Sequence, residues 1–236
     1  MKNLLCLIFL LFFFLTAQAQ EIRPVASTFQ DYLPLFQDAG FRAFSFDISS
    51  LQDSTYRFEF IIKEYEHGEI VEEKVLSRNV LTSQNRMMLS MFSPEDQKAI
   101  LESGRAYDAA KGIYKVSKRF TIGFHPTTTD SLVKMIIDLN PMMTLSRKLP
   151  LKPLDAPGHE GEYQYDMRSF KVHAFKPGEF IPLVLIGSFW WDERFKIIRS
   201  CGESELPADM RSDMFKRMPH YYVIGVVLRR ERIAAV

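Results

Sequence analysis

The sequence lacks the motifs that mark the common enzyme classes, and it has no excess of charge of either sign. It contains no glycine-rich phosphate loop, no Gly-x-Ser-x-Gly elbow and no His-Glu-x-x-His helix motif. Its 30 basic residues stand against 29 acidic ones, so bulk charge does not favour binding to nucleic acid or to an anionic membrane. We therefore expect no nucleic-acid partner, no bound metal and no cofactor.

Residues 1–19 have the three parts of a cleavable signal peptide. Lys2 supplies a positive start, residues 4–15 are an uninterrupted apolar run, and residues 17–19 (Ala-Gln-Ala) form a small-x-small cleavage site. The apolar run is too short for a membrane-spanning helix, which needs about 20 such residues. We expect cleavage after Ala19, export to the periplasm or the medium, and no stable membrane insertion afterwards.

Cysteine is scarce, and cleavage of the leader removes one of the two. The remaining Cys201 cannot close an intramolecular disulfide, so stability must come from packing. Cys201 directly follows an apolar strand pattern, and a free cysteine in such a place is usually a small buried side chain. It stays a candidate nucleophile, although a nucleophile needs a positioned base that a sequence does not show.

Alternation of apolar and polar residues predicts strands along most of the chain. The expected strands lie in residues 41–76 (three strands separated by turns), 113–125, 132–139, 163–175, 180–191, 195–200 and 221–228. With His67 and Gly68 at the centre of a turn, Lys63 falls opposite Glu72. Residues 180–191 are almost wholly apolar and are the expected core. These patterns predict an α+β fold of mostly antiparallel hairpins, in one or two packed sheets.

Two short helices complete the prediction. Ser93 is a suitable N-cap for a helix over residues 94–103, in which Ile100 and Leu101 are the expected buried residues. A second helix is expected over residues 207–218. Its methionines share one face at a spacing of four and are expected to pack in the core; they are Met210, Met214 and Met218.

A proline-rich segment divides the mature chain. Residues 149–158 hold three prolines and a closing glycine, a composition unsuited to a helix or a central strand. We interpret this segment as a linker between an N-terminal β-rich half, residues 20–148, and a C-terminal β-rich half, residues 159–236. Each half is near the minimum size for independent stability, so two domains and one continuous domain both remain open.

Polar residues near the linker are the candidates for catalysis. His159 and Glu160 lie in a glycine-containing acidic stretch that we interpret as a solvated loop, because a metal site needs three or four converging ligands. His173 and His220 are each isolated in strands, which indicates structural roles. The candidate catalytic residues are therefore Cys201, His159 and Glu160.

Paired aromatic residues are the candidates for binding. Trp190, Trp191, Tyr221 and Tyr222 are suited to stacking on a sugar or a peptide. Successive residues of a strand point to opposite faces, so at most one residue of each pair can join a given platform. Packing in the core is the simpler explanation for all four.

Two stretches, together with the leader, resemble a known group of sequences. They are residues 107–114, Tyr-Asp-Ala-Ala-Lys-Gly-Ile-Tyr, and residues 219–225, Pro-His-Tyr-Tyr-Val-Ile-Gly. The pattern resembles an uncharacterised family of exported proteins from Bacteroides-type bacteria, classed as a domain of unknown function. The resemblance implies an envelope location and transfers no catalytic residue.

Three functions remain open from the sequence. The first is a non-enzymatic exported envelope or binding protein that recognises a protein or a glycan, which the aromatic content of 13% and the lack of a catalytic constellation favour. The second is a hydrolase that uses Cys201, or His159 with a carboxylate. The third is a self-associating structural protein whose strand edges pair between copies. One scaffold hosts many functions, so fold class does not choose among them.

Overall fold

The computed structural model describes residues 29–231 except 50, 52–54, 82, 86–88, 103–105, 109–112, 116–118, 140–141, 172–175, 201 and 204. The chain divides into two compact units, Met1–Leu35 and Phe36–Val236, and all strands among the described residues belong to the second. Over the described residues, no helix combines the length and the apolar character needed to cross a membrane.

Strands dominate the described residues. In chain order the elements are α2 (Phe29–Asp38), β1 (Arg42–Asp47), β2 (Thr55–Glu66), β3 (Glu69–Leu81), β4 (Ser83–Asn85), α4 (Pro94–Glu102), β5 (Ala106–Asp108), β6 (Ile113–Lys115), β7 (Arg119–Pro126), β8 (Leu132–Leu139), β9 (Met143–Pro150), β10 (Tyr165–Lys171), β11 (Phe180–Ser188), β12 (Trp190–Asp192), β13 (Ile197–Arg199), β14 (Glu205–Pro207), α5 (Met214–Arg217) and β15 (His220–Glu231).

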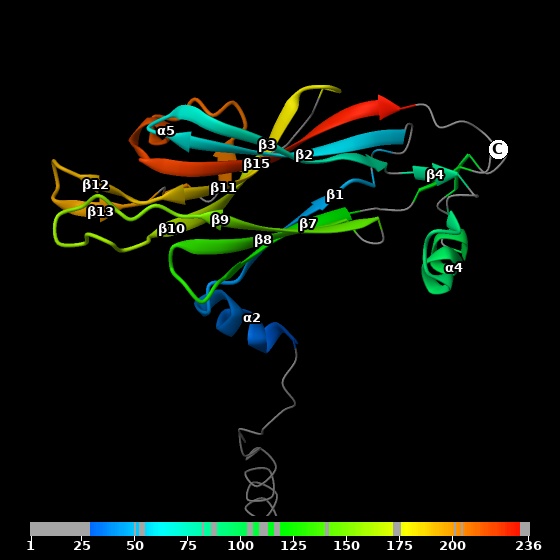
Figure 1. The fold of residues 1–236 in the computed structure, drawn as a ribbon, viewed down its shortest axis with the longest axis horizontal. Coiled ribbons are helices and arrows are strands. Elements are labelled where there is room, and N and C mark those ends of the chain that lie inside the picture. The colour runs from blue at the N-terminus through cyan, green and yellow to red at the C-terminus, as the bar shows by residue number, and fades with distance from the viewer. Residues whose placement is uncertain are drawn as a thin grey trace, which may run out of the picture. The chain divides into compact units, whose positions relative to one another are not determined.

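Two larger sheets form separate layers of the second unit (Figure 1). One has six strands in the order β14-β10-β11-β15-β2-β3, and the other has four in the order β1-β7-β8-β9. All neighbours are antiparallel except β10 and β14, which run parallel. Two smaller sheets have the orders β12-β13 and β4-β6-β5. The α+β, mostly antiparallel prediction is thus confirmed, although the described part of the chain has three helices where two were expected.

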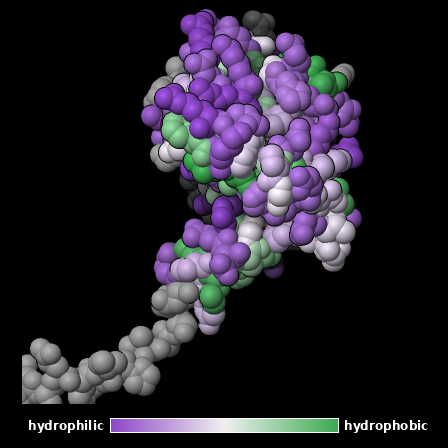
Figure 2. All heavy atoms as spheres, turned by 90° about the vertical axis from the view of Figure 1, so that its left-hand side faces the viewer, coloured by the Kyte–Doolittle hydropathy of each residue, from purple (hydrophilic) through white to green (hydrophobic). Residues whose placement is uncertain are grey.

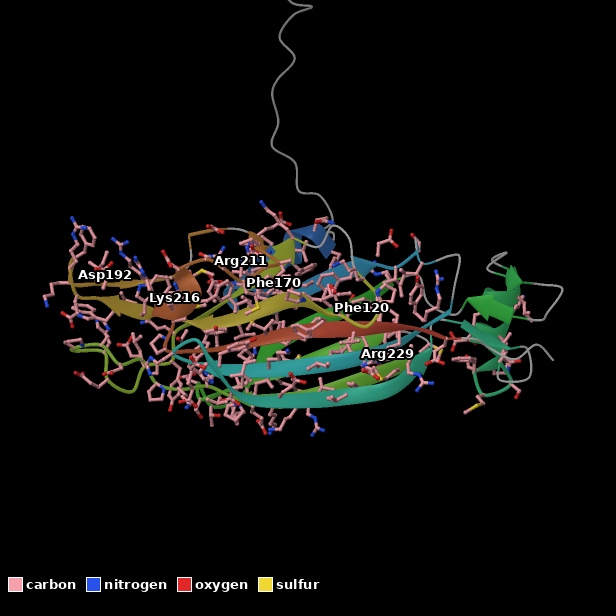
Figure 3. The ribbon with its side chains drawn as sticks, turned by 90° about the horizontal axis from the view of Figure 1, so that it is seen from above. Phe120, Phe170, Asp192, Arg211, Lys216 and Arg229 are labelled. Atoms are coloured by element: carbon pink, nitrogen blue, oxygen red, sulfur yellow. The ribbon has the colours of Figure 1, made fainter. Side chains whose placement is uncertain are left out.

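The inner faces of the two larger sheets bury the main hydrophobic cluster. Phe120 of β7 contacts Phe58 and Phe60 of β2 with ring centroids 5.8 and 5.4 Å apart. A second cluster lies on the other face of the six-stranded sheet, where α5 packs and where Phe170 stacks on Phe215; Figure 3 labels Phe120 and Phe170 from the two clusters. Residues 181–188 of β11 are all buried, which confirms that this apolar strand is core.

Strand pairing differs from the predicted order at two places. β1 and β2 are not hairpin partners, because β1 pairs with β7 in the four-stranded sheet. The expected single strand over residues 113–125 is two strands, β6 and β7, in different sheets. Period-two alternation indicates which face of a strand is buried. It does not indicate which neighbouring strand pairs with it, because either sheet of the sandwich offers a buried inner face.

The turn at His67 and Gly68 is confirmed, with φ angles of 48° and 86°. The predicted partner of Lys63 was wrong by one residue, because Lys63 pairs with Glu73 and makes an ion pair of 3.1 Å with it. An irregularity between Glu64 and Tyr65 shifts the register and accounts for the difference.

Both predicted helices are present, with corrections. Ser93 caps α4, since its Oγ accepts a hydrogen bond from the backbone N–H of Asp96 at 3.1 Å. Ile100 is 2% exposed, but Leu101 is 45% exposed, because a helix of this length buries one face only. The second helix begins at Met214 instead of residue 207, since Pro207 lies in β14 and pairs with β10.

The predicted linker overlaps a strand that the sequence did not reveal. β9 continues to Pro150, the last residue of an edge strand, where the missing N–H of proline is tolerated. Beyond it, Leu154 and Ala156 are buried, and the Leu154 N–H donates to the Glu162 carbonyl at 2.7 Å. Strands from before and after this segment share the six-stranded sheet.

Candidate functional site

A cleft of about 210 Å³ lies between the edge strands of the two larger sheets. β3 ends the six-stranded sheet and β9 ends the four-stranded one, and both line the cleft. Its apolar lining consists of Ile62, Leu76, Leu149, Pro150 and the ring of Tyr222. Charged residues complete the lining, so the cleft combines an apolar floor with a polar rim.

The charged residues occupy positions that face the other sheet. Along β2 the inward positions are apolar through Ile62, and the next one is Glu64. Lys74 pairs with Ile62 and Glu72 with Glu64, so both β3 residues share that inward face. On β9, Arg147 pairs in register with the fully buried Met135 and also faces inward. The cleft is therefore the place where the inner faces of β2 and β3 change from apolar to charged and where Arg147 interrupts the apolar inner face of β9.

The carboxylates of the cleft have partners, whereas the guanidinium of Arg147 does not. Glu72 makes an ion pair with Lys74, and Glu64 is hydrogen-bonded to His220. Within the described part of the chain, Arg147 makes no ion pair and no side-chain hydrogen bond. Lys148 follows Arg147 directly and pairs with Lys134, so its side chain is on the opposite face of β9.

A buried imidazole lies behind the cleft. His220, the first residue of β15, is 1% exposed, and its Nε2 lies 3.0 Å from Oε1 of Glu64. Its Nδ1 lies 2.6 Å from the Tyr165 hydroxyl, and its ring packs edge-on against Tyr222 with centroids 4.9 Å apart. Because the carboxylate accepts only, Nε2 carries the proton and Nδ1 accepts the hydrogen bond that the Tyr165 O–H donates. All ring hydrogen-bonding positions of a neutral His220 are thereby used.

The same network ties the end of β9 to the six-stranded sheet. The Tyr222 hydroxyl donates to the Pro150 carbonyl at 2.8 Å, and the Lys152 N–H donates to the Tyr165 hydroxyl at 2.9 Å. The Lys152 ammonium also makes an ion pair with Glu66. These contacts hold the end of β9 against the six-stranded sheet beside the cleft.

Burial determines the protonation states in this network. Burial lowers the pKa of His220, although the neighbouring Glu64 carboxylate partly opposes that shift. Burial also raises the pKa values of Tyr165 and Tyr222, and the negative charge of Glu64 adds to both shifts. The hydrogen bond from Lys152 lowers the pKa of Glu66. At neutral pH the network consists of a neutral imidazole, two intact phenols and two carboxylates.

The lowered pKa of His220 predicts a loss of stability in mild acid. An unfolded histidine titrates near pH 6.5, whereas the buried ring takes up its proton only at lower pH. Below that pH the unfolded chain binds more protons than the folded one, so the free energy of unfolding falls until the pH passes the folded pKa. Urea unfolding from about pH 7.5 to about pH 5 should show this decline, and H220Q should flatten it. Equal slopes in the two proteins would contradict the assignment.

The polar candidates from the sequence lie elsewhere. His159 is in a turn, where its Nδ1 lies 3.0 Å from Oε1 of Glu162, and the Glu160 carboxylate accepts from the Gly158 N–H at 3.0 Å. Cys201 and His173 lie outside the described residues. In the described ranges, no group of three histidine, cysteine, aspartate or glutamate side chains could hold a metal ion.

The aromatic candidates are divided between the two faces of the six-stranded sheet. Trp190 and Tyr221 are buried in the cluster beneath α5, where Tyr221 stacks on Tyr65 with centroids 4.6 Å apart. Tyr222 is on the opposite face and lines the cleft. Trp191 is half-buried in β12. Of the four, the structure brings Tyr222 into the candidate site.

The other residues of the site were missed by the sequence analysis. His220 was considered, but its partners Glu64 and Tyr165 are 156 and 55 residues away along the chain. A signal for the cleft was present, because an apolar alternating face becomes charged at Glu64 and another is interrupted by Arg147. Such changes indicate a polar end of a sheet, but they do not show that the strands concerned meet.

The chain was also compared with known proteins. No curated protein and no solved structure matches it at a significant level. One family model, described as a domain of unknown function (DUF5041), matches residues 11–230. The chain therefore belongs to the DUF5041 family.

Proposed function

We propose that this protein is a non-enzymatic binding protein that holds a small polar group of its ligand in the cleft between β3 and β9. The observation that carries the proposal is the set of inward-facing charged residues around that cavity, among them Arg147 and Glu72. Arg147 and Glu72 are exposed, so their charged groups are available to make hydrogen bonds to a polar ligand. Protein and glycan ligands both present such polar groups at their surfaces.

Binding is favoured over catalysis by the accessibility of the imidazole. His220 is the titratable ring beside the cleft, but it is buried and both its nitrogens are engaged. A general base must lie within hydrogen-bond reach of the substrate proton. In this arrangement His220 positions Glu64 and Tyr165, and it is not placed to exchange protons with a ligand.

Self-association through strand edges is less favoured by the same residues. Charged side chains on edge strands discourage pairing between copies, and β3 and β9 carry Glu72, Lys74, Arg147 and Lys148 at the cleft. Figure 2 shows hydrophobic residues as small separate groups on a largely hydrophilic face. Both features suit a protein that binds a ligand as a separate molecule.

The proposal includes export to the cell envelope. Its support is the leader in residues 1–19 and the resemblance to exported proteins of Bacteroides-type bacteria. An exported binding protein meets glycans and other envelope proteins, which fits a cleft that accepts a single polar unit.

Filling the cleft tests the proposal. Glu72→Trp places an indole at an inward position of β3, and Glu73→Trp places the same group on the opposite face of the same strand. Thermal shift against a panel of monosaccharides, sugar acids, amino acids and short peptides measures binding, because a ligand of the folded state raises Tm. We expect a class of compound that stabilises the wild type and E73W and has no effect on E72W. A panel without any stabilising compound, or one with equal shifts in both variants, would contradict the proposal.

A further inference from the structure

The unpaired guanidinium of Arg147 defines the ligand more closely. Arg147 is without an ion pair to any residue that the structure describes, whereas Glu64 and Glu72 each have a partner of their own. A neutral ligand would leave the Arg147 guanidinium without a charged partner. A ligand ammonium group would be repelled by it, so Arg147 favours a ligand that carries an anionic group.

Arg147 is the residue best suited to hold that anion. It faces inward from β9 with Leu149 two residues further on, so its guanidinium is presented over the apolar floor. Guanidinium groups bind carboxylates through two parallel N–H donors, an arrangement that a lysine does not offer. The cleft therefore suits a carboxylate in particular.

The carboxylates of the cleft indicate what else the ligand carries. Glu64 and Glu72 are acceptors only, and each retains lone pairs beyond the bond to its partner. Hydroxyl groups donate to such acceptors without adding charge. An acidic side chain of a peptide offers no hydroxyl donors and would meet repulsion from both carboxylates, so a polyhydroxylated carboxylate fits better.

The size of the cleft limits the ligand to one unit. Pockets for drug-sized molecules are about 300–1,000 Å³. At about 210 Å³ the cleft takes a smaller group. A free monosaccharide acid and the terminal unit of an acidic glycan present the same chemistry at this scale.

We propose that the cleft binds a sugar acid, with the ligand carboxylate on Arg147 and the ligand hydroxyls on Glu64 and Glu72. This inference rests on the proposed binding function and specifies its ligand class. It assigns Arg147 as the residue that determines specificity for acidic over neutral sugars.

Calorimetric titration of the purified protein tests the inference. The probes are glucuronate and galacturonate, their neutral counterparts glucose and galactose, a short oligogalacturonate, and an acidic dipeptide. We expect both monosaccharide acids to bind with a Kd of about 1 mM or tighter, and the neutral sugars to bind at least about tenfold more weakly. R147Q should weaken binding of the acids by about tenfold or more, while R211Q, an exposed arginine outside the cleft, should match the wild type.

The outcomes separate this inference from the function on which it rests. Failure of both sugar acids to bind, equal binding of neutral sugars, an unaffected R147Q, or tighter binding of the acidic dipeptide would each overturn the sugar-acid assignment. If another compound still stabilises the wild type and E73W but not E72W, the cleft remains a binding site and only its ligand class is wrong. Binding of the oligogalacturonate but not of the monosaccharides would identify a glycan terminus as the source of the group.

R147K keeps the charge but loses the paired donors, so its affinity for the sugar acids should lie between those of the wild type and R147Q.

Discussion

We expect replacement of Gly225 by alanine to lower the free energy of unfolding by about 3 kcal/mol. Gly225 lies within β15, between β11 and β2 of the six-stranded sheet. A Cβ at this position would lie 2.3 Å from the Ile181 carbonyl oxygen and 2.5 Å from the Phe180 ring. The carbonyl belongs to the backbone of a neighbouring strand with partners on both sides, so it cannot move away cheaply. Urea unfolding measures the loss.

Gly123 provides the matched control. It also lies inside a central strand, β7, but a Cβ there would meet its nearest atoms at 3.9 Å, an ordinary contact. We expect Gly123→Ala to change the free energy of unfolding by less than about 1 kcal/mol. Similar losses at the two positions would show that strand propensity, and not the close approach of β11, determines the effect.

Replacement of His220 by alanine should cost about 3 kcal/mol of stability. The change deletes a buried ring and leaves the Tyr165 hydroxyl and the Glu64 carboxylate without their shared partner. Buried polar groups without partners carry a desolvation penalty that adds to the lost packing. Because the network also anchors the end of β9, the same variant should weaken ligand binding in the cleft.

His159→Ala is the control for that experiment. His159 lies in a turn and interacts with the exposed Glu162, so its loss should cost less than about 1 kcal/mol. If H220A is as stable as H159A, the buried network does not support the sandwich, and the proposed positioning of the end of β9 fails with it.

Both faces of β15 are buried, so we expect substitutions on either face to be destabilising. On one face His220 and Tyr222 point toward the cleft, and on the other Tyr221 packs in the cluster beneath α5. Tyr221 stacks on Tyr65, its direct cross-strand partner. A strand buried on both sides therefore supports the site and the second hydrophobic cluster at once.

The sequence by itself determined the local features of this protein. Alternation identified the buried faces of β7 and β8, Ser93 identified the start of α4, and His67 with Gly68 identified a turn. These features follow from the chemistry of a few neighbouring residues. The strand β9 was missed because Arg147 interrupts its apolar face and Pro150 ends it.

Only the tertiary structure decided which strands pair and which charged residues meet. In the structure β1 pairs with β7, and strands from before and after the proline-rich segment share one sheet. The sequence does not predict these pairings, because the apolar faces of the strands have similar patterns. The cleft exists because Glu64 on β2 and Arg147 on β9 lie at the same end of two packed sheets. Burial of His220 between strands distant along the chain then determines its protonation, since a pKa depends on surroundings that only folding creates.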